Sequence, residues 1–196
     1  MDNRVAQIHR QTKETDVAVE LNLDGVGKYD IDIDSGVGFL DHMLTHLSKH
    51  SGIDLVVKAK GDLQVDAHHT VEDIAICLGE CLLKALGNKK GIARYGHSSV
   101  PMEDVLANVS VDLSGRSICV YNVEYRTAKI GDFDVECIEE MLRSFSNSGK
   151  FNLHTNVPYG TNSHHIAEGI FKGLGKALGA AVKVLGTDVP STKGIL

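Results

Sequence analysis

The chain has 196 residues, of which 42% are apolar, and its formal net charge is −6 at pH 7. This length and apolar content allow one large domain with a real core, while the acidic balance disfavours general nucleic-acid binding, which requires a basic face. No apolar run reaches membrane-spanning length, and the polar N-terminus lacks the apolar centre of a signal peptide. We therefore expect a cytoplasmic protein with no nucleic-acid or membrane partner.

The first half of the chain alternates between strand and helix patterns. Residues 17–23 alternate apolar with polar side chains, which predicts a strand, and Asp24-Gly25 predicts a turn after it. Tyr29, Ile31 and Ile33 predict a second strand. Apolar periodicity then predicts a helix at about 38–50, a short strand at 54–59 and a long helix at about 68–87.

The second half repeats this order. The sequence predicts a strand at 109–113, a turn at Ser114-Gly115, a strand at 118–122, a helix at about 134–148, a strand at 150–156 and a long helix at about 164–185. Similar segments recur in the same order about half the chain apart, which indicates an internal duplication.

The duplication predicts an α/β fold of the α+β type. Each half reads as β-β-α-β-(β)-α, and two such units bury their helices against each other. We expect two four-stranded sheets that enclose a helix layer. Residues 1–92 and 93–196 would be the half-repeats of one compact catalytic domain, with no fused second enzyme.

The two long helices begin with the same motif. His68-His69-Thr70-Val71-Glu72 in the first half recurs as His164-His165-Ile166-Ala167-Glu168 in the second. The first His and the Glu of each motif lie one turn apart on a single helix face, while the second His points about 100° away. Each half therefore offers an imidazole–carboxylate pair to one metal ion and a lone imidazole to another.

Further ligands are expected from the two earlier helices, where His42 in the first half corresponds to Glu140 in the second. Nitrogen and oxygen ligands without a thiolate favour an octahedral ion such as Mn²⁺. Asp66 and Asp73, which flank the first motif, either orient imidazoles or mark a solvated helix start. The alternative for the histidines, capping or packing, is disfavoured by the second copy of the motif. One predicted site consists of His42, His69, His164 and Glu168, and the other of His68, Glu72, Glu140 and His165.

Basic and hydroxyl side chains accompany the histidines. Arginine, lysine and hydroxyl groups together suit a phosphate monoester, although each one alone also fits a surface position. Lys172 lies one turn after Glu168 and is the strongest candidate from spacing alone. The remaining candidates are Arg94, Arg116, Ser191 and Lys193.

Several of these segments together resemble the imidazoleglycerol-phosphate dehydratase family, in its stand-alone form. The similar segments are RQTKET (10–15), LDG (23–25), GVGFLDHML (36–44), GDLQVDAHHTVED (61–73), KGIARYG (90–96), DLSGR (112–116), NSHHIAEGIFK (162–172) and PSTKG (190–194). The resemblance runs nearly end to end. Two positions depart from the pattern: Glu140 stands where some members have His, and Gly38 stands where many have Pro.

The resemblance implies a lyase of histidine biosynthesis that converts D-erythro-imidazole-glycerol phosphate to imidazole-acetol phosphate. It implies two Mn²⁺ ions per active site, with the imidazolate form of the substrate between them, and a homo-oligomer of 24 subunits with sites between subunits. Glu14 would transfer the side-chain proton, with a metal-bound water or hydroxide as the alternative. The resemblance places around the substrate Glu14, Arg94, Arg116, Lys172, Ser191 and Lys193, and it counts as catalytic Glu14, His42, His68, His69, Glu72, His164, His165 and Glu168.

Two alternative functions fit part of the pattern. A metal-storage or sensor protein would explain the histidines but not the basic set. A di-metal hydrolase would release free phosphate from phosphoesters, which a dehydratase does not.

Overall fold

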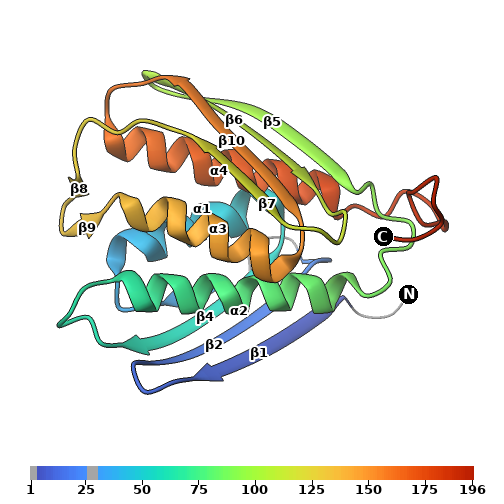
Figure 1. The fold of residues 1–196 in the computed structure, drawn as a ribbon, viewed down its shortest axis with the longest axis horizontal. Helices are drawn as coiled ribbons and strands as arrows, with labels where there is room; N and C mark the ends of the chain where they lie inside the picture. Colours follow the sequence, from blue (N-terminus) through green and yellow to red (C-terminus); the bar gives the residue numbers. More distant parts are fainter. Residues whose placement is uncertain (1–3, 26–30) are drawn as a thin grey trace.

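The structure is a computed structural model that describes residues 4–25 and 31–196. Two four-stranded sheets enclose a layer of helices (Figure 1). This arrangement confirms the expected mixed α/β fold class. Tyr29, part of the second predicted strand, lies outside the described residues, and the division into half-repeats at residues 92 and 93 stays a prediction.

The two sheets have the same topology. In the first sheet the order is β1-β2-β4-β3, and in the second it is β5-β6-β10-β7. The first three strands of each order pair antiparallel, and the fourth pairs parallel. The first sheet comprises β1 (Val5–Gln11), β2 (Thr15–Asn22), β4 (Asp54–Gly61) and β3 (Ile31–Asp34), and the second comprises β5 (Tyr95–Met102), β6 (Val105–Asp112), β10 (Asn152–Tyr159) and β7 (Ile118–Asn122).

The optional strand of each half was placed wrongly by the sequence pattern. The extra strands are β1 and β5, which precede the predicted strands. The first half therefore has the order β-β-β-α-β-α, and the second half has the same order with a short hairpin added before its first helix. Both are edge strands and mostly polar, which is why alternation did not reveal them. An edge strand also tolerates Pro101, because an outer strand need not donate every backbone N–H. A short hairpin, β8 (Lys129–Ile130) and β9 (Phe133–Asp134), was not predicted.

The four helices are close to their predicted positions. They are α1 (Gly38–Ser51), α2 (His68–Leu86), α3 (Glu136–Gly149) and α4 (Ser163–Ala181). The prediction extended α4 to residue 185, but the helix ends at Ala181. Beyond it the backbone turns to pair with the segment before β5, where Val184 forms an isolated antiparallel bridge with Ile92.

Glycines bring the helices into close contact within the layer. A Cβ added to Gly179 of α4 would lie 2.3 Å from the backbone oxygen of Ser51 on α1. A Cβ added to Gly79 of α2 would lie 2.6 Å from the backbone nitrogen of Gly149 on α3. The layer therefore consists of two close pairs, α1 with α4 and α2 with α3.

The helix pairs place both histidine motifs at one end of the molecule. In Figure 1, α2 and α4 begin at the end where β8 and β9 lie, and the start of β1 and the C-terminus lie at the opposite end. Among the residues that the structure describes, no helix is long and apolar enough to cross a membrane.

Candidate functional site

Three predicted ligands meet where α1 crosses the start of α4. The ligand atoms of His42, His164 and Glu168 all lie within 4.8 Å of one another. Glu168 Oε2 is 3.2 Å from His164 Nε2 and 3.6 Å from His42 Nε2. The helix begins here because the side chain of Asn162 accepts hydrogen bonds from the backbone N–H groups of His164 and His165. The predicted i, i+4 pair is therefore present, and α1 completes it.

Glu168 is a buried carboxylate that stays ionised. Its other oxygen, Oε1, lies 2.6 Å from Lys172 Nζ, and the residue is only 8% exposed. Burial raises the pKa of Glu168, but the Lys172 hydrogen bond, His46 and His164 outweigh it and lower the pKa to about 2. At neutral pH the cluster therefore contains a fixed negative charge beside two imidazoles.

His46, one turn after His42, belongs to the same cluster, although it was not among the predicted site residues. Its Nε2 lies 3.3 Å from His42 Nε2 and 3.4 Å from Glu168 Oε1. Burial lowers the pKa of His46 to about 4, so the ring is neutral at pH 7. Its buried Nδ1 has no hydrogen-bond partner among the described residues.

His69 lies in a different cluster. Its Nδ1 is 3.0 Å from Asp62 Oδ2 and 3.9 Å from Glu14 Oε2. The hydrogen bond to Asp62 raises the pKa of His69. One chain therefore brings together three ligands of the first predicted site and holds the fourth, His69, elsewhere.

His165 makes an equivalent contact in the second half. Its Nδ1 lies 2.8 Å from Asp104 Oδ1. The other oxygen of Asp104 accepts hydrogen bonds from the backbone N–H and hydroxyl of Thr161 and from the backbone N–H of Asn162. The hydrogen bonds from Thr161 and His165 hold the pKa of Asp104 well below its usual range.

Asp62 and Asp104 were missed by the sequence reasoning, and the carboxylates it considered have other partners. Asp66 accepts a hydrogen bond from the backbone N–H of His68, and Asp73 pairs with Arg10 and Thr15. A signal did exist for Asp104, since it occupies in the β5–β6 hairpin the position that Glu14 occupies in the β1–β2 hairpin.

The second predicted metal site is less complete. His68 and Glu72 lie on the first turn of α2, which packs against α3, where Glu140 Oε1 accepts a hydrogen bond from the Ser144 hydroxyl at 2.9 Å. Within 4–25 and 31–196 these side chains do not form a group of three ligand atoms inside 4.8 Å. Their role as ligands stays a prediction.

The predicted phosphate contacts separate into two places. Arg94 donates to Asp112 at 2.7 Å and to the backbone oxygen of Pro190 at 2.9 Å, and its φ of 69° is in the left-handed region. Its backbone N–H donates to Ala181, at the C-terminal end of α4. The turn that precedes Arg116 lies close to the C-terminal segment, because a Cβ added to Gly115 would lie 3.1 Å from the backbone carbonyl carbon of Leu196. Lys172, in contrast, is bonded to Glu168.

The cluster of His42, His164 and Glu168 and the predicted phosphate contacts around Arg94 are far apart within one chain. His164 lies in the first turn of α4, and Arg94 contacts the C-terminal end of this helix. A rise of about 1.5 Å per residue places the two ends roughly 25 Å apart.

A cavity of about 760 Å³ lies beside the cluster of predicted metal ligands. Its wall includes His42, His164 and the β8–β9 hairpin.

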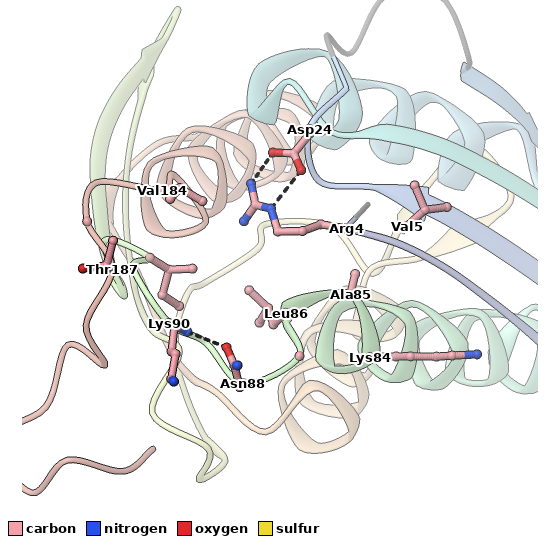
Figure 2. Close-up of a pocket in the computed structure, with 13 residues that line it drawn as sticks. Arg4, Val5, Asp24, Lys84, Ala85, Leu86, Asn88, Lys90, Val184 and Thr187 are labelled. Carbon is pink, nitrogen blue, oxygen red and sulfur yellow. Dashed lines mark hydrogen bonds and ion pairs between the residues drawn. The ribbon is translucent and has the colours of Figure 1, made fainter. Parts of the chain in front are cut away.

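A separate cavity of about 420 Å³ lies at the C-terminal ends of α2 and α4 (Figure 2). Arg4 pairs with Asp24 at its edge and donates to the backbone oxygen of Val182 at 2.6 Å. Lys84 and Lys90 also line it, but none of the predicted site residues does. We therefore regard the cluster of His42, His164 and Glu168 as the candidate site.

Together these features define a class: a duplicated, two-sheet α/β enzyme whose paired helices begin with repeated histidine–glutamate motifs. The sequence matches the family profile of imidazoleglycerol-phosphate dehydratase over residues 35–178. It is 53% identical over 194 residues to the imidazoleglycerol-phosphate dehydratase of Desulforudis audaxviator, covering 98% of both chains. It is 52% identical over 192 residues to that of an Exiguobacterium species, covering 97% of both.

Solved structures agree with the sequence comparisons. The crystal structure of imidazoleglycerol-phosphate dehydratase from Staphylococcus aureus superposes with a TM-score of 0.83 at 37% identity, covering 92% of this chain and 99% of the other. The enzyme from Pyrococcus furiosus gives a TM-score of 0.83 at 38% identity, covering 96% and 100%. The chain belongs to the imidazoleglycerol-phosphate dehydratase family, and it is therefore a dehydratase of histidine biosynthesis.

Proposed function

We propose that the chain converts D-erythro-imidazole-glycerol phosphate to imidazole-acetol phosphate at a site that holds two Mn²⁺ ions. Family membership supports the reaction. The observation that carries the proposal is the convergence of His42, His164 and Glu168, whose ligand atoms lie within 4.8 Å of one another. Neither alternative function has a specific observation in its favour.

The donor set fits the ions. Imidazole nitrogens and carboxylate oxygens suit Mn²⁺, and the low pKa of Glu168 keeps its carboxylate available as a ligand. The first ion would be held by His42, His69, His164 and Glu168, and the second by His68, Glu72, Glu140 and His165. When bound, the ions would act as Lewis acids that withdraw electron density from the imidazole ring of the substrate.

The separation of the two groups supports a site between subunits. A small phosphorylated imidazole cannot bridge the roughly 25 Å between the start of α4 and the Arg94 end of the same chain. The position of His69, away from His42 and His164, also supports a site between subunits. We propose that neighbouring copies, in an assembly of 24, bring the phosphate-binding end of one chain to the metal-binding end of another.

The remaining roles follow from the charge and hydrogen-bonding capacity of the side chains. Arg94, Arg116, Ser191 and Lys193 would bind the phosphate, since guanidinium, ammonium and hydroxyl groups suit its oxygens. Lys172 contacts Glu168 and so would hold the carboxylate as well as line the substrate site.

Glu14 would transfer the proton. Its side chain is 58% exposed, and its Oε2 lies 3.9 Å from His69 Nδ1, beyond hydrogen-bond distance. The substrate loses hydroxide from the carbon attached to the ring and a proton from the next carbon, which Glu14 would accept. The resulting enol tautomerises to the ketone, so that water is the only molecule lost.

A turnover assay tests the proposal. The assembled protein is stripped with chelator and given imidazole-glycerol phosphate with and without Mn²⁺, and both the ketone and free phosphate are measured. We expect ketone only with metal, without phosphate release. Free phosphate would favour the hydrolase, and metal binding without any ketone would favour storage, so either result would overturn the dehydratase assignment.

A further inference from the structure

The second histidine of each motif makes the same kind of contact. His69 Nδ1 lies 3.0 Å from Asp62 and His165 Nδ1 lies 2.8 Å from Asp104. A carboxylate accepts a hydrogen bond, so each Nδ1 carries a proton. In a neutral imidazole, Nε2 is then left with a lone pair that can bind a metal ion.

The two carboxylates come from different parts of the fold. Asp62 directly follows β4, whereas Asp104 lies in the β5–β6 hairpin. Asp104 corresponds in register to Glu14, because β1 pairs Gln11 with Asp16 and β5 pairs Pro101 with Leu106. The duplication therefore repeats the contact with the imidazole but not the residue that makes it. Duplication of a single loop therefore does not explain why both histidines contact a carboxylate.

We propose that Asp62 and Asp104 are positioning residues that keep the proton of His69 and His165 on Nδ1 and so leave Nε2 to bind metal. This inference rests on the proposed function, in which both histidines are ligands. Asp104 is held firmly for the task, since Thr161 and Asn162 donate three hydrogen bonds to its other oxygen. The side chain of Asp62 is only 15% exposed.

The hydrogen bonds of Asp104 make Asp104→Asn a sharp test. The three donors from Thr161 and Asn162 require an oxygen at the Oδ2 position, so the amide nitrogen of the variant must face His165. An amide N–H₂ donates to Nδ1 and moves the imidazole proton to Nε2, which blocks metal binding. Because an oxygen still accepts the loop hydrogen bonds, the fold is retained. Asp62 lacks such donors to its second oxygen among the described residues, so Asp62→Ala is the better variant there.

The measurement is the Mn²⁺ affinity of the assembled, chelator-stripped protein, obtained by competition with a chelating dye and resolved into two sites per chain. Loss of an orienting partner typically costs 10–100-fold in metal affinity. We expect Asp104→Asn and Asp62→Ala each to weaken one site by about this factor and to leave the other within threefold of wild type.

Two controls distinguish a positioning role of the carboxylates from a purely structural role. Asp16→Ala breaks the surface pair between Asp16 and His9, which are 2.6 Å apart, and should not change the affinity. Thr161→Val removes one donor to Asp104 and leaves the His165 contact, so it should lower the melting temperature but not the affinity. If Thr161→Val weakened metal binding as much as Asp104→Asn, the carboxylate would act only through the loop, and the inference would be wrong.

Substitution of the histidines distinguishes a failure of the positioning role from a failure of the proposed function. If His165→Gln and His69→Gln each lose one ion while Asp104→Asn and Asp62→Ala bind both normally, the positioning role is refuted and the proposed function stands. If the histidine variants also bind both ions with wild-type affinity, the proposed ligand set itself is wrong.

Discussion

Replacing Lys172 with Met removes the ammonium group that lies 2.6 Å from Glu168 Oε1. The buried carboxylate of Glu168 then lacks this compensating charge. The lowering of the Glu168 pKa from 4.5 to about 2 corresponds to roughly 3 kcal/mol of stabilisation, at about 1.4 kcal/mol per unit. Lys172 supplies the largest of the contributions that lower this pKa. We therefore expect the metal-free variant to lose ~2–3 kcal/mol at pH 7, or a melting temperature lower by ~4–12 °C.

The pH dependence follows from the sign of the shift. A carboxyl group with a lowered pKa contributes stability that is fully present above about pH 4.5 and is lost as the pH falls towards 2. The difference between wild type and Lys172→Met should therefore be largest at neutral pH and shrink below pH 4.5. Added Mn²⁺ should restore part of the loss, because a cation at the cluster again compensates the Glu168 charge.

The assay is thermal unfolding of chelator-stripped protein at one subunit concentration, from pH 3 to pH 8, with and without Mn²⁺. Lys176→Met, one turn further along α4 and exposed, is the matched control, and it should stay within about 0.5 kcal/mol of wild type. Equal melting temperatures of the two lysine variants at pH 7, or the same loss for Lys172→Met at pH 3 as at pH 7, would contradict the stabilisation of Glu168 by Lys172.

Two further substitutions examine the reaction and the helix layer. Glu14→Gln should lower turnover by ~10²–10⁴-fold with both metal sites intact, because general acid–base catalysis is lost but no ligand is. Ketone formation and bound manganese are measured together, with exposed Glu20→Gln as control, and normal turnover of Glu14→Gln would contradict the role. Gly179→Ala should destabilise by ~1–3 kcal/mol, since the new methyl would lie 2.3 Å from the Ser51 oxygen. Gly186→Ala, with open space around it, is the comparison in urea unfolding, and equal stability of the two variants would contradict the close contact.

The helix positions could be predicted because they depend on local periodicity, and the duplication could be predicted because similar segments recur half a chain apart. The ends of elements depend on distant partners instead. Val182, Val184 and Leu185 continue an apolar pattern that predicts helix up to 185, yet Val184 pairs with Ile92 in the distant segment before β5. The edge strands β1 and β5 were missed because their buried faces carry few large apolar side chains. In β5 the buried positions are Gly96, Ser98 and Val100, so burial alternates along the strand while hydrophobicity does not.

In the candidate site, too, local patterns could be predicted and contacts between distant residues could not. The i, i+4 spacing of His164 and Glu168 was readable because both lie on one helix face. The partner of His165, Asp104, is 61 residues away in the chain, and no periodic pattern connects them. Asp66 and Asp73 lie nearer to a motif in sequence, but one caps the start of α2 and the other binds Arg10. Contacts between loops have to be found in three dimensions.

The two halves differ most informatively at the hairpin position shared by Glu14 and Asp104. In the second half this carboxylate is fully engaged by His165, Thr161 and Asn162, which hold its pKa well below the usual range. In the first half Asp62 makes the imidazole contact instead, and Glu14 stays exposed at 3.9 Å from His69. A carboxylate that must accept a proton cannot also be saturated with hydrogen-bond donors that lower its basicity. The departure from symmetry therefore favours the proposal that Glu14, rather than Asp104, transfers the proton.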